Sequence, residues 1–238
     1  MKSIRKAAGR VILVCLIAIA ALSLYNIIKI IMEYAEENSA YEEMRKVAET
    51  EEGLDWEALR EMNGDVIGWI KLEGTKIDYP IVQGSDNSWY LNVLFDGQPG
   101  NCGTLFADFR HNEPFGDTNT IVYGHNMKDG TMFGSLKKLK EEDYLKEHES
   151  FSLSTPDEEY ELRVVAVLVI DPEDELYRTS FTDAAEVNAW LSRIESKAML
   201  LTNEQLEEDA RYVMLSTCST PDRTLRDVVI GKLHYRNE

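Results

Sequence analysis

The sequence predicts a mainly β fold, a barrel or sandwich with peripheral helices. Strand-length apolar runs recur from residue 66 onward, and Gly, Asn, Asp and Pro interrupt them at short intervals. Short strands with such punctuation favour an antiparallel-rich barrel or sandwich over a parallel α/β sheet. At 238 residues, of which 44% are hydrophobic, the chain is long enough for one well-buried domain and an appendage.

The first 32 residues have the pattern of a membrane segment. Four basic residues within the first ten precede an uncharged run over 11–25, and apolar residues continue to Met32 with Lys29 as the only charge. About 20 such residues span a bilayer, and a basic flank stays in the cytoplasm. We expect a single-pass cell-membrane anchor over 1–32, a cytoplasmic N-terminus and an extracellular C-terminal domain. A cleaved secretory signal is the alternative, because residues 21–23 resemble a cleavage site.

A helical region is predicted between the anchor and the body of the chain. Residues 33–52 are rich in helix formers with few apolar positions, as in a solvated stalk. Gly53 breaks this pattern, and Asp55 is expected to cap a second helix that ends at Asn63. The predicted division is therefore a stalk and N-terminal helix over 33–63, followed by one domain over 64–238.

Strands with a few inserted helices are predicted along the body. A hairpin joins 66–72 to 77–82, with Pro80 indicating an edge or a bulge. Asp183 and Glu186 form a capping box for a late helix. The remaining predicted elements are strands over 103–109, 120–123, 151–153 and 160–170, a helical turn at 88–91 and an amphipathic helix over 132–139.

A hairpin over 211–233 organises the C-terminal part of the chain. The first strand is an apolar run that ends on Cys218, and the second opens on Arg226 before a β-branched run. Ser219, Thr220, Pro221 and Asp222 supply turn chemistry between them. Hairpin geometry places the cysteine and the arginine at the same end of adjacent strands, where a cation favours thiolate over thiol.

Charge and cysteine content narrow the function classes. The formal net charge of −18 argues against a nucleic-acid partner, because phosphate binding needs a basic face. The three cysteines, Cys15 in the membrane segment, Cys102 and Cys218, are too few for a disulfide scaffold. Either Cys102 and Cys218 pair, or at least one is a thiol kept for its reactivity. A metal site with His111 and His125 lacks the short paired spacings of zinc proteins.

Cys218, His125 and Arg226 are the candidates for chemistry, because each lies next to a predicted strand end. A thiolate, a proton shuttle and an oxyanion donor together support acyl transfer. Each also has a structural interpretation: the cysteine as a small hydrophobe, the histidine as a satisfied structural residue, and the arginine as a surface partner of Asp222 or Asp227. The other three histidines are interpreted as structural: His111, His148 and His234.

Longer motifs add a family resemblance. They are the Leu-Ser-Thr-Cys motif at 215–218, the arginine eight residues later, and the Tyr-Gly-His-Asn-Met motif at 123–127, with further matching segments at 65–70, 77–83, 86–91, 103–106 and 128–133. Together these resemble the class B sortases, the membrane-anchored cysteine transpeptidases of Gram-positive bacteria. Met214 departs from the threonine usual in that class. Residues 169–206 show little motif match, so a groove-walling helix is expected there by position only.

The resemblance implies a sortase-type eight-stranded β-barrel with N-terminal helices and a helix inserted before the late strands. It implies cleavage of a C-terminal sorting signal after Thr through a Cys218 thioacyl intermediate, followed by transfer of the surface protein to a peptidoglycan precursor or cross-bridge amine. His125 would protonate the leaving amine and Arg226 would hold the oxyanion. No cofactor or metal is implied. The residues that correspond to the substrate groove are Tyr123, Ser216, Thr217, Asn87 and Leu91.

Two alternatives remain at this stage. A pilus-polymerising class C sortase usually carries a lid before the barrel and a second apolar anchor after it, whereas this sequence stops at Glu238 without such a tail. A non-catalytic extracellular barrel would keep the groove only for binding peptides. The joint presence of Cys218, His125 and Arg226 argues against that second alternative.

Overall fold

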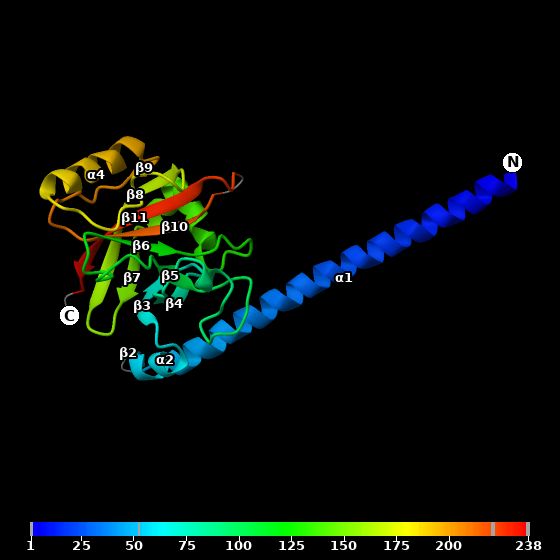
Figure 1. The fold of residues 1–238 in the computed structure, drawn as a ribbon, viewed down its shortest axis with the longest axis horizontal. Coiled ribbons are helices and arrows are strands. Elements are labelled where there is room, and N and C mark those ends of the chain that lie inside the picture. The colour runs from blue at the N-terminus through cyan, green and yellow to red at the C-terminus, as the bar shows by residue number, and fades with distance from the viewer. Residues whose placement is uncertain (1, 52, 220–221, 237–238) are drawn as a thin grey trace. The chain divides into compact units, whose positions relative to one another are not determined.

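The computed structural model describes residues 2–51, 53–219 and 222–236, and its main feature is a closed β-barrel (Figure 1). Eight strands follow the order β11-β10-β6-β5-β4-β3-β7-β8, and β8 pairs back to β11, which confirms the predicted barrel. The strands are β3 (Val66–Lys71), β4 (Asp78–Val82), β5 (Leu105–Ala107), β6 (Asn119–Tyr123), β7 (Ser150–Ser154), β8 (Glu159–Ile170), β10 (Tyr212–Cys218) and β11 (Arg226–Tyr235).

Three neighbouring strands bring their ends together at one end of the barrel. Strand β10 runs parallel to β6 and antiparallel to β11, so the ends of β6 and β10 lie beside the start of β11. The hairpin register pairs Cys218 directly with Arg226, which confirms that the two residues lie at the same end of adjacent strands. Thr220 and Pro221 of the predicted turn lie outside the described residues. The polypeptide that follows β6 carries His125 to the same end.

The predicted hairpin of β3 and β4 also forms, and its proline is accommodated inside the sheet. Pro80 pairs with Trp69 of β3, while β5 pairs only with Ile81 and Val82 beyond it. The missing N–H of the proline therefore interrupts no ladder bond to β5. A register shift does occur in this hairpin, but it lies between Val66 and Gly68 of β3 and not at Pro80.

The chain also forms helices and short strands that are not among the eight barrel strands. The helical elements are α1 (Lys2–Ala48), α2 (Trp56–Met62), η1 (Trp89–Leu91), η2 (Phe133–Lys140), α3 (Glu142–Glu147) and α4 (Ala184–Lys197). The short strands are β1 (Glu49–Thr50) paired with β2 (Gly53–Leu54), and β9 (Leu200–Leu201) paired with β8.

The predicted helix caps are present with one difference in partner. The Asp55 carboxylate accepts from the Ala58 N–H at the start of α2, and the Asp183 carboxylate accepts from the Glu186 N–H at the start of α4. The Glu186 carboxylate accepts from the Thr182 N–H rather than from Asp183, so the box closes one residue earlier than expected.

The expected amphipathic helix after His125 is a 3₁₀-helix, η2, and not an α-helix. Its apolar residues Phe133, Leu136 and Leu139 recur every three positions, which matches the three-residue turn of this helix type, and all three are fully buried. The spacing of three is compatible with one face of either helix, so the sequence pattern does not separate them.

Helix α4 covers the outer face of the barrel on strands β6, β8, β10 and β11. Trp190 and Ile194 of the helix pack with Tyr212 and Met214 of β10, and the Trp190 indole meets the Tyr212 ring edge to face. Val213, one position along β10, is equally buried on the opposite, inner face. Strand β10 is thus buried on both faces, which explains its uninterrupted apolar run.

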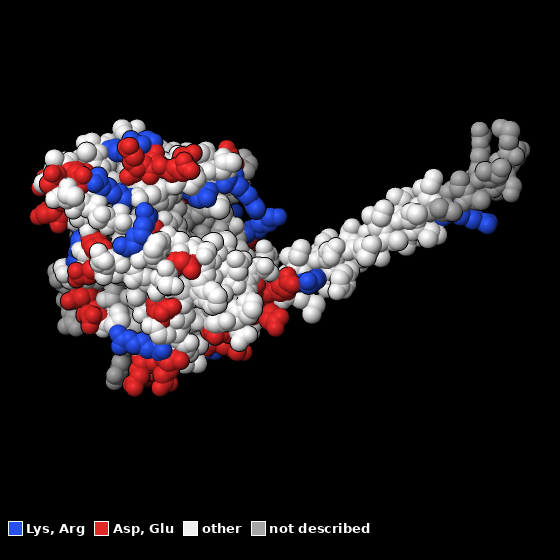
Figure 2. All heavy atoms as spheres, in the orientation of Figure 1, with Lys and Arg blue, Asp and Glu red and all other residues white. Residues whose placement is uncertain are grey.

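The chain divides into two compact units, 1–46 and 47–238. The first consists of most of α1, which from Ile12 onward is long and apolar enough to cross a membrane, a property shared with signal sequences. Figure 2 shows the middle of this helix without charged side chains, whereas acidic and basic groups are scattered over the second unit. The groups that catalyse a reaction must be sought in the second unit.

Candidate active site

A groove of about 780 Å³ opens at the barrel end where β6 and β10 finish and β11 begins. Cys218, His125 and Arg226 all line it, so the structure brings the three predicted side chains into one hollow. The five residues predicted for the groove line it as well: Asn87, Leu91, Tyr123, Ser216 and Thr217.

The nucleophile candidate and the arginine face each other across the first pair of the hairpin. Cys218 is partly exposed at the end of β10. The Arg226 guanidinium donates from Nη1 to the carbonyl oxygens of Arg223 and Leu225, at 3.1 and 3.0 Å. Among the described residues no carboxylate pairs with Arg226. Its charge is therefore not neutralised by a local anion, and its remaining donors are available to a developing oxyanion.

His125 follows β6 on a segment whose backbone packs tightly. The residue before it must be small, because a Cβ on Gly124 would lie 2.3 Å from Leu105 Cδ2 and 2.7 Å from a Phe133 ring carbon. The His125 Nε2 lies 2.7 Å from the carbonyl oxygen of Leu91. A carbonyl oxygen only accepts, so Nε2 carries the proton and Nδ1 is the nitrogen that can take up or release another.

Asn126 joins the histidine segment to the nucleophile directly. Its side-chain amide Nδ2 donates to the Cys218 carbonyl oxygen at 2.6 Å. Asn126 lies within the Tyr-Gly-His-Asn-Met motif, but no role for it was predicted from the sequence. The only available signal was its position next to His125, since the contact spans 92 residues of sequence.

A buried ion pair lies behind the nucleophile. The Lys140 ammonium at the end of η2 donates to both Asp227 carboxylate oxygens, at 2.9 and 3.0 Å, and the Ser219 hydroxyl donates to Oδ1 at 2.7 Å. Asp227 is 1% exposed. Because Ser219 follows Cys218 and Asp227 follows Arg226, this pair fixes both catalytic candidates and the helix that leads away from His125. Asp227 therefore has a different partner from the one weighed in the sequence analysis.

Tyr177 forms a wall of the groove that the sequence analysis missed. Its hydroxyl lies 2.7 Å from the Ser216 hydroxyl, and its ring stacks on Tyr123 with centroids 6.3 Å apart. Burial raises the pKa of Tyr177 to about 12, so the phenol stays protonated and uncharged at neutral pH. Tyr177 lines the same groove as Arg226 and Cys218, so its phenol belongs to the site that holds the candidate reacting groups.

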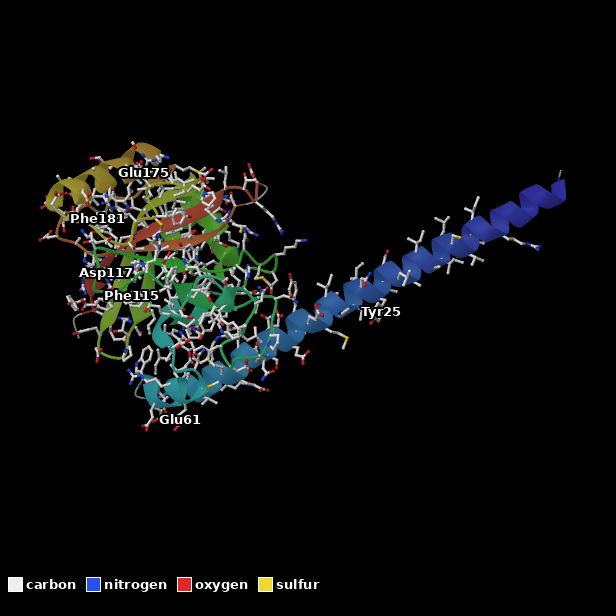
Figure 3. The ribbon with its side chains drawn as sticks, in the orientation of Figure 1. Tyr25, Glu61, Phe115, Asp117, Glu175 and Phe181 are labelled. Carbon is white, nitrogen blue, oxygen red and sulfur yellow. The ribbon has the colours of Figure 1, made fainter. Side chains whose placement is uncertain are left out.

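The segment that forms this wall differs from the one expected from the sequence. A helix between residues 169 and 206 was expected to line the groove, but α4 contributes no lining residue; the loop before it, Pro172 to Tyr177, lines it instead. The sequence offers no pattern that would separate these two arrangements. Figure 3 shows Glu175 on this loop, on the side of the barrel that α4 covers.

Helix α4 supports that loop through Asp174. The Asp174 carboxylate, 3% exposed, pairs with Arg193 and Lys197 of the helix and accepts from the Leu176 N–H. Burial alone would raise the pKa of Asp174, but the hydrogen bonds from Arg193 and Lys197 outweigh it and lower the pKa to about 2. The charge that holds the wall is therefore present throughout the neutral range.

Asp108 supports the opposite side of the groove. Its wholly buried carboxylate accepts from Arg110 Nε and Nη2 at 2.8 and 2.7 Å, and from Asn87 Nδ2 and the Tyr123 hydroxyl at 3.0 Å each. Burial acts to raise the pKa of Asp108, but these hydrogen bonds, led by Arg110, lower it to about 2. Burial and the Asp108 charge together raise the pKa of Tyr123.

The remaining cysteines and histidines lie elsewhere. Cys102 is buried and is not joined to Cys218 by a disulfide, while Cys15 lies in α1. His111 accepts from the Ile121 N–H, and His148 bonds the Tyr144 carbonyl oxygen, as structural histidines do. His234 lies 3.2 Å from a Glu204 carboxylate oxygen. None of these side chains lines the groove.

The arrangement as a whole suits acyl transfer to sulfur. A thiol at a strand end, an imidazole with one nitrogen fixed, and an uncompensated guanidinium surround one solvent-accessible groove. A peptide carbonyl placed there would meet a nucleophile, a proton donor and an oxyanion donor together.

Comparisons with known proteins agree with this geometry. A family model described as "Sortase domain" matches residues 70–234. The chain is 34% identical over 177 residues to sortase B of Listeria monocytogenes, covering 74% of this chain and 72% of the relative. The Staphylococcus aureus sortase B–substrate complex matches with a TM-score of 0.72 and 30% identity, over 76% of this chain and 85% of that one. The Bacillus anthracis sortase B in complex with AAEK1 matches with a TM-score of 0.78 and 33% identity, over 87% and 100%.

Proposed function

Because the chain belongs to the sortase family, within the sortase B group of cysteine transpeptidases, we propose that it cleaves a C-terminal sorting signal after Thr and transfers the protein to a cell-wall amine. The observation that carries this proposal is that Cys218, His125 and Arg226 line one groove, with Cys218 and Arg226 opposite each other in the register of β10 and β11.

The first half-reaction forms a thioester. The Cys218 thiolate attacks the carbonyl carbon of the substrate Thr, and the carbonyl oxygen takes the negative charge. Arg226 donates to this oxyanion from the part of its guanidinium not held by Arg223 and Leu225. When the tetrahedral species collapses, the C–N bond breaks and His125 gives its proton to the departing amine.

The second half-reaction resolves the thioester with an amine. The amine attacks the thioester carbonyl, His125, now neutral, accepts the proton that the amine loses, and the C–S bond breaks to return Cys218 as thiolate. The Leu91 carbonyl holds Nε2 throughout, so the proton moves at Nδ1 in both directions. No redox partner or cofactor enters this balance.

The groove on either side of Cys218 is proposed to bind the sorting signal. Its lining combines apolar surface from Leu91 and Tyr123 with polar groups from Asn87, Ser216 and Thr217, the mixture typical of peptide-binding clefts. The solved sortase B–substrate complex of the Staphylococcus aureus relative supports peptide binding in this fold.

The apolar part of α1 supports a membrane anchor over 1–32. In the proposed arrangement the basic N-terminus stays in the cytoplasm, residues 33–63 form a stalk and the first helix of the body, and the catalytic domain over 64–238 lies outside the cell. There it would meet its proposed partners, surface proteins with a sorting signal and the amine of a peptidoglycan precursor or cross-bridge.

The test uses the full chain in detergent and a quenched fluorescent peptide that contains Pro-x-Thr. We expect cleavage that increases with added amine, and we expect Cys218→Ala to abolish it. The matched control is Cys102→Ala, since Cys102 is buried away from the groove and should leave cleavage intact. Cleavage that survives Cys218→Ala would overturn the proposed function.

A further inference from the structure

The groove contains a second guanidinium that the proposed reaction does not use. Arg110 follows β5 and lines the same groove as Cys218, with 46% of its side chain exposed. In the proposed reaction the oxyanion belongs to Arg226. A long cationic side chain that faces a peptide-binding groove without a role in the chemistry is a candidate for substrate recognition.

Arg110 is held in place by a carboxylate with no exposure to solvent. Two guanidinium nitrogens, Nε and Nη2, donate to Asp108 at 2.8 and 2.7 Å, and the Arg110 backbone N–H donates to the same carboxylate at 3.0 Å. Asn87 and Tyr123 donate to Asp108 as well, so four groups from three segments fix its position. The guanidinium plane is therefore set before a ligand arrives.

The charge of this pair decides which ligand it suits. Asp108 is ionised at neutral pH, so the Arg110–Asp108 pair has no net charge. A guanidinium has five N–H donors, and the two hydrogen bonds to Asp108 leave donors for a ligand. A carboxylate ligand would be repelled by Asp108, and an ammonium would be repelled by Arg110 and finds no free acceptor on the pair. An uncharged oxygen meets neither repulsion.

We propose that Arg110, held by Asp108, is a specificity-determining residue that donates to an uncharged carbonyl oxygen of the bound peptide. This inference rests on the proposed function, because it takes the ligand of the groove to be the sorting signal. The carbonyl belongs either to a side-chain amide or to the peptide backbone, and the experiment below separates these two sources.

Binding is measured with the full chain carrying Cys218→Ala in detergent, so that no cleavage interferes. The probes are fluorescein-labelled peptides that contain Pro-x-Thr, with Gln, Glu or Lys placed in turn at each position before Thr. For a side-chain amide we expect one position at which Gln binds better than Glu and Lys. At that position, Asp108→Asn should raise the affinity for the Glu peptide relative to the Gln peptide by about fivefold to tenfold, because the Arg110 charge is then uncompensated.

The half-exposed Arg110 supplies a second variant that does not depend on the buried carboxylate. Arg110→Gln should remove the preference at that position and leave Gln, Glu and Lys peptides within about twofold of each other. For a backbone carbonyl, Arg110→Gln should instead weaken every peptide by the same factor, while Asp108→Asn still favours the Glu peptides. A merely structural role for Asp108 predicts equal losses for Gln, Glu and Lys peptides.

The matched control is another Arg–carboxylate pair with the same sequence spacing outside the groove. Arg163 Nε and Nη2 donate to Glu161 at 2.9 and 2.7 Å on β8, and neither residue lines the groove. Glu161→Gln should leave all peptide affinities unchanged. If the Cys218→Ala chain binds peptides but Asp108→Asn and Arg110→Gln do not alter the ranking or the affinity, the Arg110 assignment is wrong. If it binds none of these peptides better than a scrambled sequence, the proposed function fails, and this assignment with it.

Discussion

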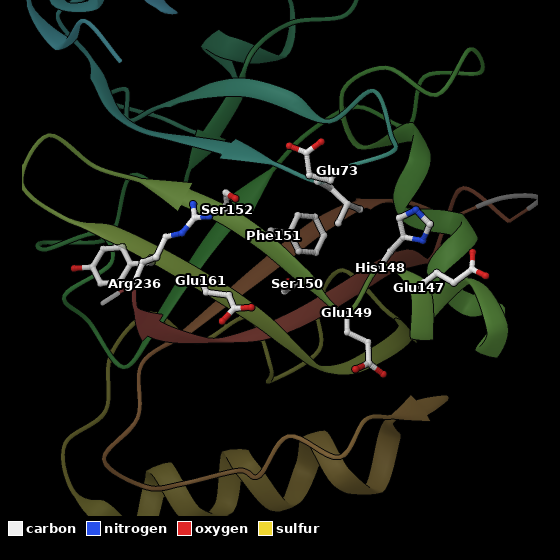
Figure 4. A pocket seen from close by; sticks show the side chains of 11 residues that line it. Glu73, Glu147, His148, Glu149, Ser150, Phe151, Ser152, Glu161 and Arg236 are labelled. Atoms are coloured by element: carbon white, nitrogen blue, oxygen red, sulfur yellow. The ribbon is translucent and has the colours of Figure 1, made fainter. Parts of the chain in front are cut away.

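Two hollows of the second unit differ in a way that separates a candidate active site from an ordinary surface depression. The groove with Cys218 measures about 780 Å³, and the hollow in Figure 4 measures about 410 Å³. The second lies against β7 and the start of β8, and four glutamates line it together with His148 and Arg236. Both hollows thus contain carboxylates, a histidine and an arginine.

The groups in the second hollow are already satisfied or lie in solvent. Glu161 pairs with Arg163 and Glu73 pairs with Lys71, while His148 bonds the Tyr144 carbonyl and stacks on the Tyr144 ring. No thiol is among its lining residues. In the groove, by contrast, Arg226 bonds only backbone carbonyls among the described residues, and buried carboxylates fix the surrounding segments.

This comparison shows that residue types alone do not define a site. What distinguishes the groove is the convergence of three strand ends, a nucleophile, and three buried carboxylates, Asp108, Asp174 and Asp227, that hold the neighbouring segments. Function depends on such local arrangements, and the barrel supplies the frame. Substitutions in the groove should therefore change cleavage or stability far more than substitutions in the second hollow.

The largest expected difference in activity between matched variants of the two hollows is the one between their histidines. His125→Ala should lower kcat/KM for peptide cleavage by about 10² to 10⁴, because the departing amine then has no proton donor. His148→Ala should change kcat/KM by less than about twofold, as expected for a surface side chain. The measurement is steady-state cleavage of the fluorescent peptide by both variants. Equal losses in the two would remove the distinction between the hollows.

The two arginines are expected to differ by a smaller factor. Arg226→Ala should lower kcat by about 10²-fold, the scale of one oxyanion donor, and Arg226→Lys should not restore full activity because an ammonium lacks the planar set of donors. Arg236→Ala in the second hollow serves as the matched control. Full activity in Arg226→Lys would show that a point charge is sufficient.

Asp108 of the groove and Glu161 of the second hollow should differ in how their ionisation changes the stability of the fold with pH. The pKa of Asp108 is lowered from 3.8 in the unfolded chain to about 2. A lowered folded-state pKa stabilises the fold above the unfolded pKa, and that stability is lost as the pH falls from about 4 through 2. The contribution is about 2 kcal/mol.

Urea unfolding of the wild type and Asp108→Asn measures this difference. The wild type should have a larger free energy of unfolding than Asp108→Asn at pH 5, and this difference should narrow between pH 4 and pH 2. Glu161→Gln is the counterpart, and because Glu161 is half-exposed and screened by solvent, we expect no comparable pH-dependent gap. A gap for Asp108→Asn that stays constant with pH would mean that its ionisation does not stabilise the fold.

The smallest effect is expected at Glu149, an exposed carboxylate of the second hollow. Glu149→Gln should change cleavage by less than about twofold, because surface substitutions rarely matter beyond this scale. A larger loss, measured in the same peptide assay, would indicate that the second hollow takes part in the reaction.

Much of the fold is predictable from the sequence because its strands are local patterns. The hairpin of β10 and β11 has an apolar run, a turn and a β-branched run in order, so hairpin geometry places Cys218 and Arg226 at the same end of adjacent strands, while their direct pairing is seen only in the structure. The barrel closure between β8 and β11 has no local signal, and its prediction depended on the family resemblance.

The supporting groups of the site were not predictable in the same way. Asn126 and Tyr177 act through partners that lie 92 and 39 residues away in the sequence, and Asp108 joins its neighbour Arg110 to Asn87, which lies 21 residues away. No spacing rule connects residues so far apart. Tyr177 also lies in the segment without motif match, where an irregular loop forms the wall and a helix supports it from behind.

The most direct test of the central claim locates the acyl group itself. The full chain is mixed with the Pro-x-Thr peptide without added amine, quenched in acid, and its intact mass and peptide map are measured. We expect one thioester on Cys218, kept in Cys102→Ala and absent in Cys218→Ala. An acyl group on Cys102, or peptide cleavage with no acyl group on any cysteine, would contradict it.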